Sequence, residues 1–229
     1  MILNEGGNIF KDPNGQIATR RINKADVAPT LSWLEQVTGL ELSANTLGTT
    51  GIAPTSGDID VAVDQSKVTK DELADKLTQW AVKNKQDPKQ WVKKSGISVH
   101  FKTPIKGSAN NGYVQTDLMF GDPKFMQFAL RGAADSEFKG QHRMIMIASI
   151  AKAQGYKWSP TNGLVDRITN EPVTKDPGEV AKTLLGDGAT ADDMRSVETI
   201  NAKIKTDPNY ENLVKDAKDY FEKEGLQLP

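Results

Sequence analysis

The sequence lacks cysteine and has little histidine. With 0 cysteines and 2 histidines in 229 residues, the chain cannot form a disulfide, a cysteine-ligated zinc site or a catalytic thiol. A histidine-rich metal site is not expected either. Any metal would have to be held by carboxylates, which favour hard ions such as Mg²⁺ or Mn²⁺.

Long apolar runs and an excess of charge are also missing. No stretch approaches the length of a membrane span, and the N-terminal residues show no basic region followed by an apolar one, so no signal peptide is predicted. We therefore expect a cytoplasmic protein with no membrane partner. The formal net charge is −1, so any contact with nucleic acid must come from a local basic patch.

What the chain does contain is a strand-rich first half and a helical second half. Apolar periodicity predicts helices near 26–39 and 69–82, the second opened by a capping box of Thr69 and Glu72. Strands are predicted at 42–48, 58–64, 95–104 and 113–121, and helices dominate after 122, with a short hairpin at 162–173. This order favours an α+β fold with an N-terminal arm (1–25), a mixed α/β domain (26–121) and a mainly helical subdomain (122–229).

Three aspartates occupy two of the predicted strands. Asp58 and Asp60 alternate with apolar residues, so they project from the same face of one strand. Asp117 sits within the apolar strand at 113–121. If the two strands are neighbours in a sheet, the three carboxylates converge, and such a group can hold two Mg²⁺ ions about 3.5–4 Å apart. The alternative is a chance pair of acids on a surface turn.

The segment before the first aspartate is rich in glycine and hydroxyl groups. Gly48 lets the backbone approach a phosphate closely, while Thr49, Thr50 and Ser56 offer hydroxyls and backbone N–H groups. Taken with the aspartates, this loop predicts a site for the phosphates of a nucleotide.

These residues together resemble the nucleotidyltransferases of the DNA polymerase beta type. The resemblance is carried by Gly48-Thr49, by Ser56-Gly57-Asp58-Ile59-Asp60-Val61 and by Asp117 on a later strand. The segment from 137 to 164 is similar to the start of the thumb in family X DNA polymerases, at Phe138, Arg143, Ala148, Ala151, Gly155 and Gly163. The resemblance implies a palm with a mixed β-sheet flanked by helices, followed by a thumb-like helical subdomain.

The resemblance also implies an activity. A nucleoside monophosphate would pass from a nucleoside triphosphate such as ATP to an acceptor hydroxyl, in the first instance the 3′ end of DNA or RNA. Asp58, Asp60 and Asp117 would bind two Mg²⁺ or Mn²⁺ ions, with Asp117 also assisting deprotonation of the acceptor. Gly48, Thr49, Thr50, Ser56 and Gly57 would hold the nucleotide, and Arg143 would lie near the nucleic acid.

The chain departs from the family pattern at several places, two of which lie near the aspartates. The arginine that commonly contacts the triphosphate from this loop is missing, because Gly51, Ile52 and Ala53 stand there. The basic residue often found two positions before the third aspartate is Gln115. These departures keep two alternatives open: a non-catalytic nucleic-acid-binding protein on the same fold, or a transferase that modifies a protein or a small molecule.

A local basic stretch is the candidate surface for nucleic acid. It centres on Lys93 and Lys94 and extends to Lys89, Lys102 and Lys106. Such a stretch can follow a phosphate backbone, although runs of charge are more often solvated surface. His100 lies on the strand between these lysines and is predicted to be a solvated strand histidine.

Overall fold

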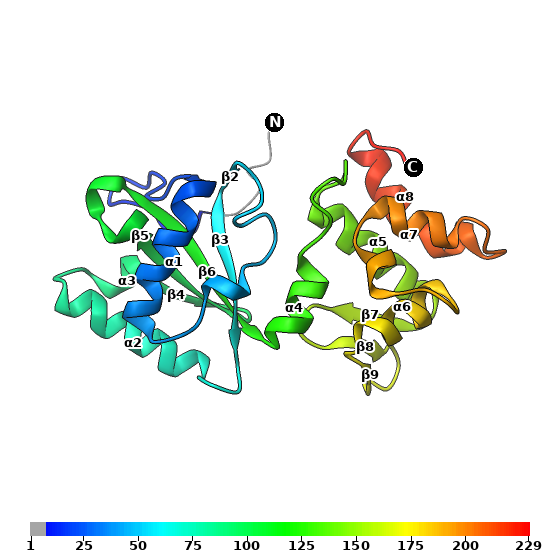
Figure 1. Ribbon diagram of the computed structural model, residues 1–229, viewed down its shortest axis with the longest axis horizontal. Helices are drawn as coiled ribbons and strands as arrows, with labels where there is room; N and C mark the ends of the chain where they lie inside the picture. The colour runs from blue at the N-terminus through cyan, green and yellow to red at the C-terminus, as the bar shows by residue number, and fades with distance from the viewer. Residues whose placement is uncertain (1–7) are drawn as a thin grey trace. The chain divides into compact units, whose positions relative to one another are not determined.

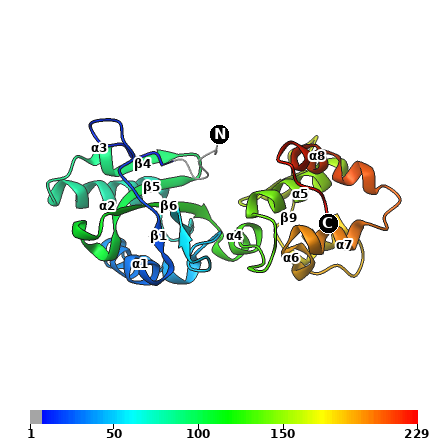
Figure 2. The same cartoon turned by 90° about the horizontal axis from the view of Figure 1, so that it is seen from above.

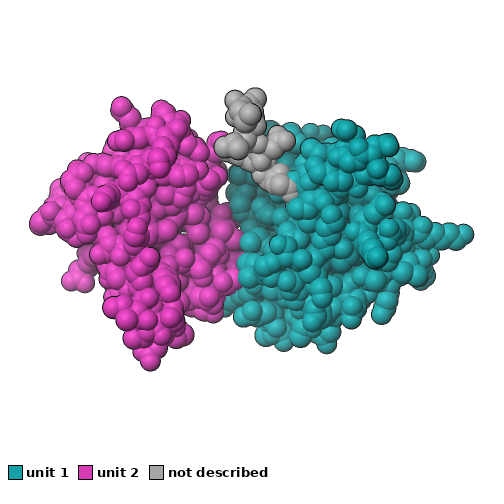
Figure 3. Space-filling model, turned by 180° about the vertical axis from the view of Figure 1, so that it is seen from behind, with its two compact units in different colours: residues 1–123 teal, residues 124–229 magenta. Residues whose placement is uncertain are grey.

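The computed structural model describes residues 8–229 and divides the chain into two compact units. The units are Met1–Pro123 and Lys124–Pro229, coloured separately in Figure 3. Over the described range, no helix combines the length and the apolar character needed to cross a membrane.

A mixed four-stranded sheet forms the centre of the first unit. Its order is β3 (Asp58–Asp64), β6 (Tyr113–Gly121), β5 (Ser98–Pro104) and β4 (Val92–Ser95). The pair β3 and β6 is parallel, and the other two pairs are antiparallel. The two aspartate-bearing strands are therefore neighbours, which is the condition for their carboxylates to converge. The α+β class with a mixed sheet is confirmed (Figure 1).

Helices pack on one face of this sheet. They are α1 (Lys24–Thr38), α2 (Lys70–Lys83) and the short α3 (Pro88–Trp91). Gly39 ends α1 in a left-handed conformation with φ 72°, which glycine adopts without steric cost. The predicted capping box opens α2, because the Thr69 side chain accepts from the Glu72 backbone N–H and the Glu72 carboxylate accepts from the Thr69 N–H.

Alternation along the strands separates a core face from a polar face. Ile59, Val61 and Val63 of β3 are buried in a cluster with apolar residues of α1 and α2. Since side chains alternate along a strand, Asp58 and Asp60 project from the opposite face. The burial of the helix-facing side chains thus fixes which face of the sheet carries the aspartates.

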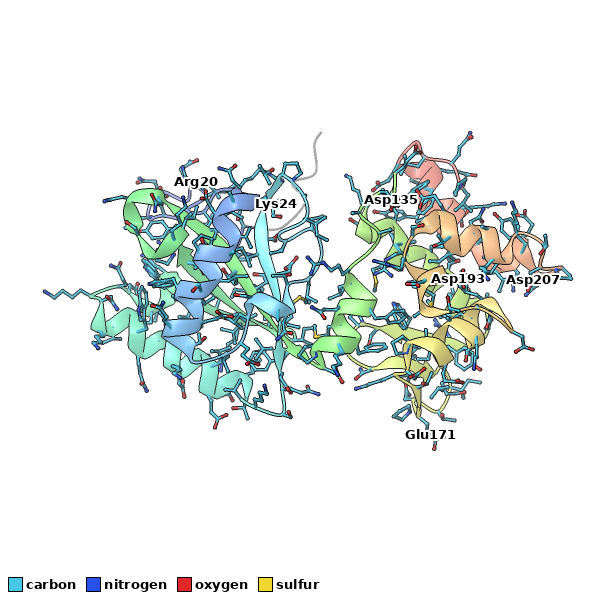
Figure 4. All side chains as sticks on the ribbon, viewed as in Figure 1. Arg20, Lys24, Asp135, Glu171, Asp193 and Asp207 are labelled. Carbon is cyan, nitrogen blue, oxygen red and sulfur yellow. The ribbon has the colours of Figure 1, made fainter. Side chains whose placement is uncertain are left out.

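The described part of the N-terminal arm packs onto the first unit. Phe10 is fully buried, and the Arg20 N–H donates to the Tyr113 carbonyl at the start of β6. The arm ends in β1 (Ile22–Asn23), which pairs with β2 (Thr55–Ser56) just before the aspartates. Figure 2 shows the arm crossing the unit, and Figure 4 labels Arg20 and the first residue of α1, Lys24.

Most of the predicted strand at 42–48 is wrong, because a 3₁₀ turn, Ser43–Asn45, stands there instead. Within this segment, Thr46 does pair with Val61 of β3 in an isolated antiparallel bridge. The Glu35 carboxylate accepts hydrogen bonds of 2.7 Å from the backbone N–H groups of both Leu42 and Ser43. Because a side chain already takes these donors, they are not available for pairing with a strand.

The second unit is mainly helical, as predicted. It contains a three-stranded antiparallel sheet whose last two strands form the predicted hairpin. Helices α5 and α8 pack against each other through residues such as Ile150 and Ala217 in the unit's own apolar core. The elements in order are α4 (Pro123–Leu130), α5 (Gly140–Ala153), β7 (Tyr156–Ser159), β8 (Gly163–Asp166), β9 (Pro172–Thr174), α6 (Pro177–Leu185), α7 (Val197–Ile204) and α8 (Tyr210–Lys223).

Candidate metal and nucleotide site

The three aspartates meet on the polar face of the first unit's sheet. The parallel register places Asp60 directly opposite Asp117, and Asp58 two residues earlier on the same face. One carboxylate oxygen from each residue lies within 4.8 Å of the other two, and all three side chains are half-buried. Two strands of regular geometry therefore bring together three carboxylates that are up to 59 positions apart in the printed sequence.

The carboxylates disturb one another's ionisation. Burial, followed by the charges of Asp58 and Asp117, raises the pKa of Asp60 to about 8. Burial and the charge of Asp117 also raise the pKa of Asp58, although Arg21 and His100 oppose that rise. Within the described residues, no donor makes a hydrogen bond to the Asp60 carboxylate. The three carboxylates are therefore not all ionised at neutral pH, and a bound cation would favour their ionised forms.

The donor set fits a hard divalent ion. Three carboxylates supply the oxygen ligands that Mg²⁺ and Mn²⁺ prefer, and they leave room for waters or for phosphate oxygens of a substrate. A soft metal would find no thiolate here, because the chain has no cysteine. Asp58, Asp60 and Asp117 are thus the residues that would hold the ion.

The loop before β3 lies against the carboxylates. Gly48 adopts φ 53°, and a Cβ atom built there would lie 3.3 Å from Asp60 Oδ2. Both the backbone conformation and this close approach favour glycine. Thr49 next to it is exposed, and Gly57 is half-buried, so both remain accessible to a ligand.

Two of the predicted nucleotide-binding hydroxyls do not face solvent. Thr50 is 1% exposed, and its Oγ1 accepts a hydrogen bond of 3.0 Å from the Asp60 backbone N–H. Ser56 is 3% exposed, and its Oγ lies 3.5 Å from Thr49 Oγ1. In this structure the two hydroxyls therefore stabilise the loop and the start of β3, and a role of these residues in nucleotide binding stays a prediction.

His100 and Gln115 make hydrogen bonds to the third aspartate. His100 Nδ1 lies 2.7 Å from Asp117 Oδ1, and Gln115 Nε2 lies 2.9 Å from the same oxygen. The expectation of a solvated His100 is wrong, since its side chain is only 13% exposed. The pairing follows from the β5–β6 register, which depends on the loop at 105–112. The turn signal at Asn110–Gly112 does not by itself predict the length of that loop, so the sequence did not predict that His100 lies opposite Asp117.

Arg21 is a further residue that sequence reasoning missed. Its guanidinium donates to Thr55 Oγ1 and to the Thr55 carbonyl at 3.1–3.2 Å, and its charge opposes the rise in the pKa of Asp58. The pairing of β1 with β2 brings this arginine of the arm to the loop before Asp58. The pair Arg20-Arg21 is visible in the sequence, but no local pattern links it to a loop 34 residues away.

Arg143 does not have the exposed surface that contact with nucleic acid requires. Only 3% of it is exposed, and its guanidinium donates to the backbone carbonyls of Met194, Ala129 and Phe128. Burial and the charge of Arg195 lower its pKa to about 10. In this structure Arg143 ties α5 to the end of α4 and to the segment before α7, and its contact with nucleic acid stays an untested prediction.

The predicted basic stretch is largely engaged within the protein. Lys93 Nζ donates to the Ile9 carbonyl at 2.5 Å and lies 5.4 Å from the centre of the Phe10 ring. Lys94 forms an exposed ion pair of 2.7 Å with Asp71. Lys94 keeps the exposure that a contact with phosphate needs, whereas Lys93 holds the arm against the sheet.

Comparison with known proteins gave no identification. No model of a known protein family matches the chain, and a search of curated proteins found no match.

Proposed function

We propose that the first unit is a metal-dependent nucleotidyltransferase site of the DNA polymerase beta type, a palm followed by the thumb-like second unit. The observation that carries this proposal is the convergence of Asp58, Asp60 and Asp117 on one face of a mixed sheet, directly after a glycine-containing loop. The substrate would be a nucleoside triphosphate. The acceptor would be a hydroxyl group, in the first instance the 3′ end of a nucleic acid.

The three aspartates would have different roles in the transfer. Asp58 and Asp60 would hold the metal from one strand, and Asp117 would hold it from the other and accept the proton of the acceptor hydroxyl. The acceptor oxygen bonds to the α-phosphorus, the bond to the β-phosphate oxygen breaks, and pyrophosphate leaves. When bound, two divalent ions lower the pKa of the attacking hydroxyl and neutralise charge on the leaving group.

Arg21 would supply the positive charge that the loop before β3 lacks. Residues 51–53 offer no positive side chain, yet the Arg21 guanidinium lies beside Thr55 and close enough to influence Asp58. It is exposed and therefore accessible to a phosphate group. The accessible backbone at Gly48, Thr49 and Gly57 completes the proposed cradle for the triphosphate.

Incorporation of labelled nucleotide tests the proposal. The full chain is incubated with each α-labelled nucleoside triphosphate, Mg²⁺ or Mn²⁺, and a panel of DNA and RNA primers, a protein and small hydroxyl compounds. We expect label on one class of acceptor, and none with Asp60→Asn or Asp117→Asn because positioning and charge neutralisation carry this chemistry. Nucleic-acid binding without any incorporation would favour the non-catalytic alternative.

A further inference from the structure

The Asp117 carboxylate has two oxygens in different surroundings. Oδ1 lies 2.7 Å from His100 Nδ1 and 2.9 Å from Gln115 Nε2. A carboxylate oxygen has two lone-pair positions, and these two contacts use both of them. Oδ2 is therefore the oxygen that remains available to an ion or to a proton from outside the protein.

The direction of both hydrogen bonds follows from their surroundings. Gln115 Oε1 accepts from the Ile9 backbone N–H at 3.0 Å, so the amide nitrogen must be the end that faces Asp117. An ionised carboxylate can only accept, so His100 Nδ1 must carry the hydrogen. The backbone of the arm thus fixes the glutamine amide, and the glutamine and the histidine together fix the carboxylate.

We propose that His100 and Gln115 are positioning residues that fix Asp117 Oδ1, so that Oδ2 is the oxygen directed to the metal and the acceptor. This inference rests on the proposed function and identifies which residues orient its third carboxylate. Side chains that hold a metal-binding carboxylate in place typically contribute 10–100-fold to metal affinity or activity. His100 lies on β5 and Gln115 on β6, so two different strands contribute the residues that hold Asp117 in place.

If His100 served only to compensate the charge of Asp117, its loss would change metal affinity in the opposite direction. If His100 only balanced the charge of Asp117, a metal ion would displace it from that role, and loss of the side chain would make the metal bind more tightly. A positioning role predicts weaker binding, because a free carboxylate must lose rotational freedom when the ion binds. Metal affinity therefore separates the two roles even before any activity is measured.

The test is a titration of the full chain with Mn²⁺ in which electron paramagnetic resonance measures the concentration of the free ion at each step. His100→Ala and Gln115→Leu each remove one donor, and we expect each to weaken Mn²⁺ binding by about 10–100-fold. His100→Asn places an amide N–H near the former Nδ1 position. It is expected to bind within about threefold of the wild type, well inside the effect of losing an orienting partner.

The second unit offers a matched control. His142 Nε2 lies 3.1 Å from Glu224 Oε2, so His142→Ala also breaks a histidine–carboxylate pair, but one outside the three aspartates. Its Mn²⁺ affinity should equal that of the wild type, and thermal melts of all variants report whether each one folds. If His100→Ala does not fold, Gln115→Leu and His100→Asn still give the comparison.

Two results would overturn the positioning role while leaving the proposed function intact. One is wild-type Mn²⁺ affinity in both His100→Ala and Gln115→Leu, and the other is tighter binding in His100→Ala. A wild-type chain that binds no Mn²⁺ at all would instead remove the proposed function, and this inference with it.

Discussion

Replacing Asp60 with asparagine should stabilise the protein in the absence of metal. Asp60 has a pKa of about 8 in the folded chain because of burial and of the neighbouring Asp58 and Asp117. In the unfolded chain an aspartate titrates near roughly 3.9. Between these two values the folded state binds a proton that the unfolded state has lost, so stability decreases as the pH rises.

The size of the stabilisation by Asp60→Asn follows from the pH range between the unfolded pKa of Asp60 and pH 7. A displacement of one pKa unit corresponds to about 1.4 kcal/mol, and about three units separate the unfolded value from pH 7. The upper bound is therefore about 4 kcal/mol, and water at a half-buried site reduces it, so we expect Asp60→Asn to gain about 1–3 kcal/mol. In a domain of this size that gain raises the melting temperature by about 3–10 °C.

Thermal melts in metal-free buffer measure this gain. The stabilisation of Asp60→Asn relative to the wild type should be present at pH 7. It should shrink as the pH falls and approach zero below the unfolded pKa of about 3.9, where Asp60 is protonated in both states of the wild type. Adding Mg²⁺ in large excess should raise the melting temperature of the wild type but not of the variant, because a ligand that binds only the folded state stabilises it.

Asp64 provides the matched control on the same strand and the same face. Hydrogen bonds from the Ser66 hydroxyl and backbone N–H lower its pKa, so Asp64→Asn should not stabilise the protein at pH 7. It should also leave the Mg²⁺ response unchanged. A lower melting temperature for metal-free Asp60→Asn than for the wild type at pH 7 would refute the reasoning. It would mean that the aspartate stabilises the metal-free fold more than asparagine does.

Four further outcomes are expected from the same structure. Mg²⁺ should stabilise the wild type more at pH 8 than at pH 6, because binding must displace the proton that Asp60 holds with its pKa of about 8, and calorimetric melts at both pH values would check this. Arg21→Gln should raise the KM for the nucleoside triphosphate while the melting temperature stays near the wild-type value, because its guanidinium bonds are exposed; steady-state kinetics with no change in KM would contradict the role of Arg21. Arg143→Met should destabilise the second unit by about 2–4 kcal/mol in urea unfolding, because it leaves buried carbonyls without a donor. Lys94→Gln should weaken binding of a primer, with a smaller salt dependence, and an unchanged salt slope would show that this lysine contacts no phosphate.

Local patterns in the sequence predicted the framework of the site well. The alternation of Asp58 and Asp60 with buried apolar residues gave their shared face, and the apolar flanks of Asp117 gave its strand. The capping box of Thr69 and Glu72 gave the start of α2. Each of these features depends on residues within a few positions of one another, where periodicity and capping chemistry act directly.

The partners of the aspartates could not be predicted in the same way. The contact of His100 with Asp117 depends on the exact register of an antiparallel pair, and the approach of Arg21 to Thr55 depends on two short strands that meet across the chain. Arg143 is buried where three carbonyls from two distant segments accept from its two terminal guanidinium nitrogens. None of these contacts leaves a periodic or compositional signal, so only the tertiary structure could show them.

The central claim is that three aspartates hold divalent ions beside a nucleoside triphosphate. The number of Mn²⁺ ions bound in the presence of a nucleoside triphosphate analogue with a non-hydrolysable α–β bridge, measured by electron paramagnetic resonance, tests it most directly. We predict two ions per chain with the magnetic coupling of a pair about 3.5–4 Å apart, and loss of this coupled signal in Asp60→Asn and Asp117→Asn. A stoichiometry and spectrum that are the same in the wild type and in both variants would contradict the claim.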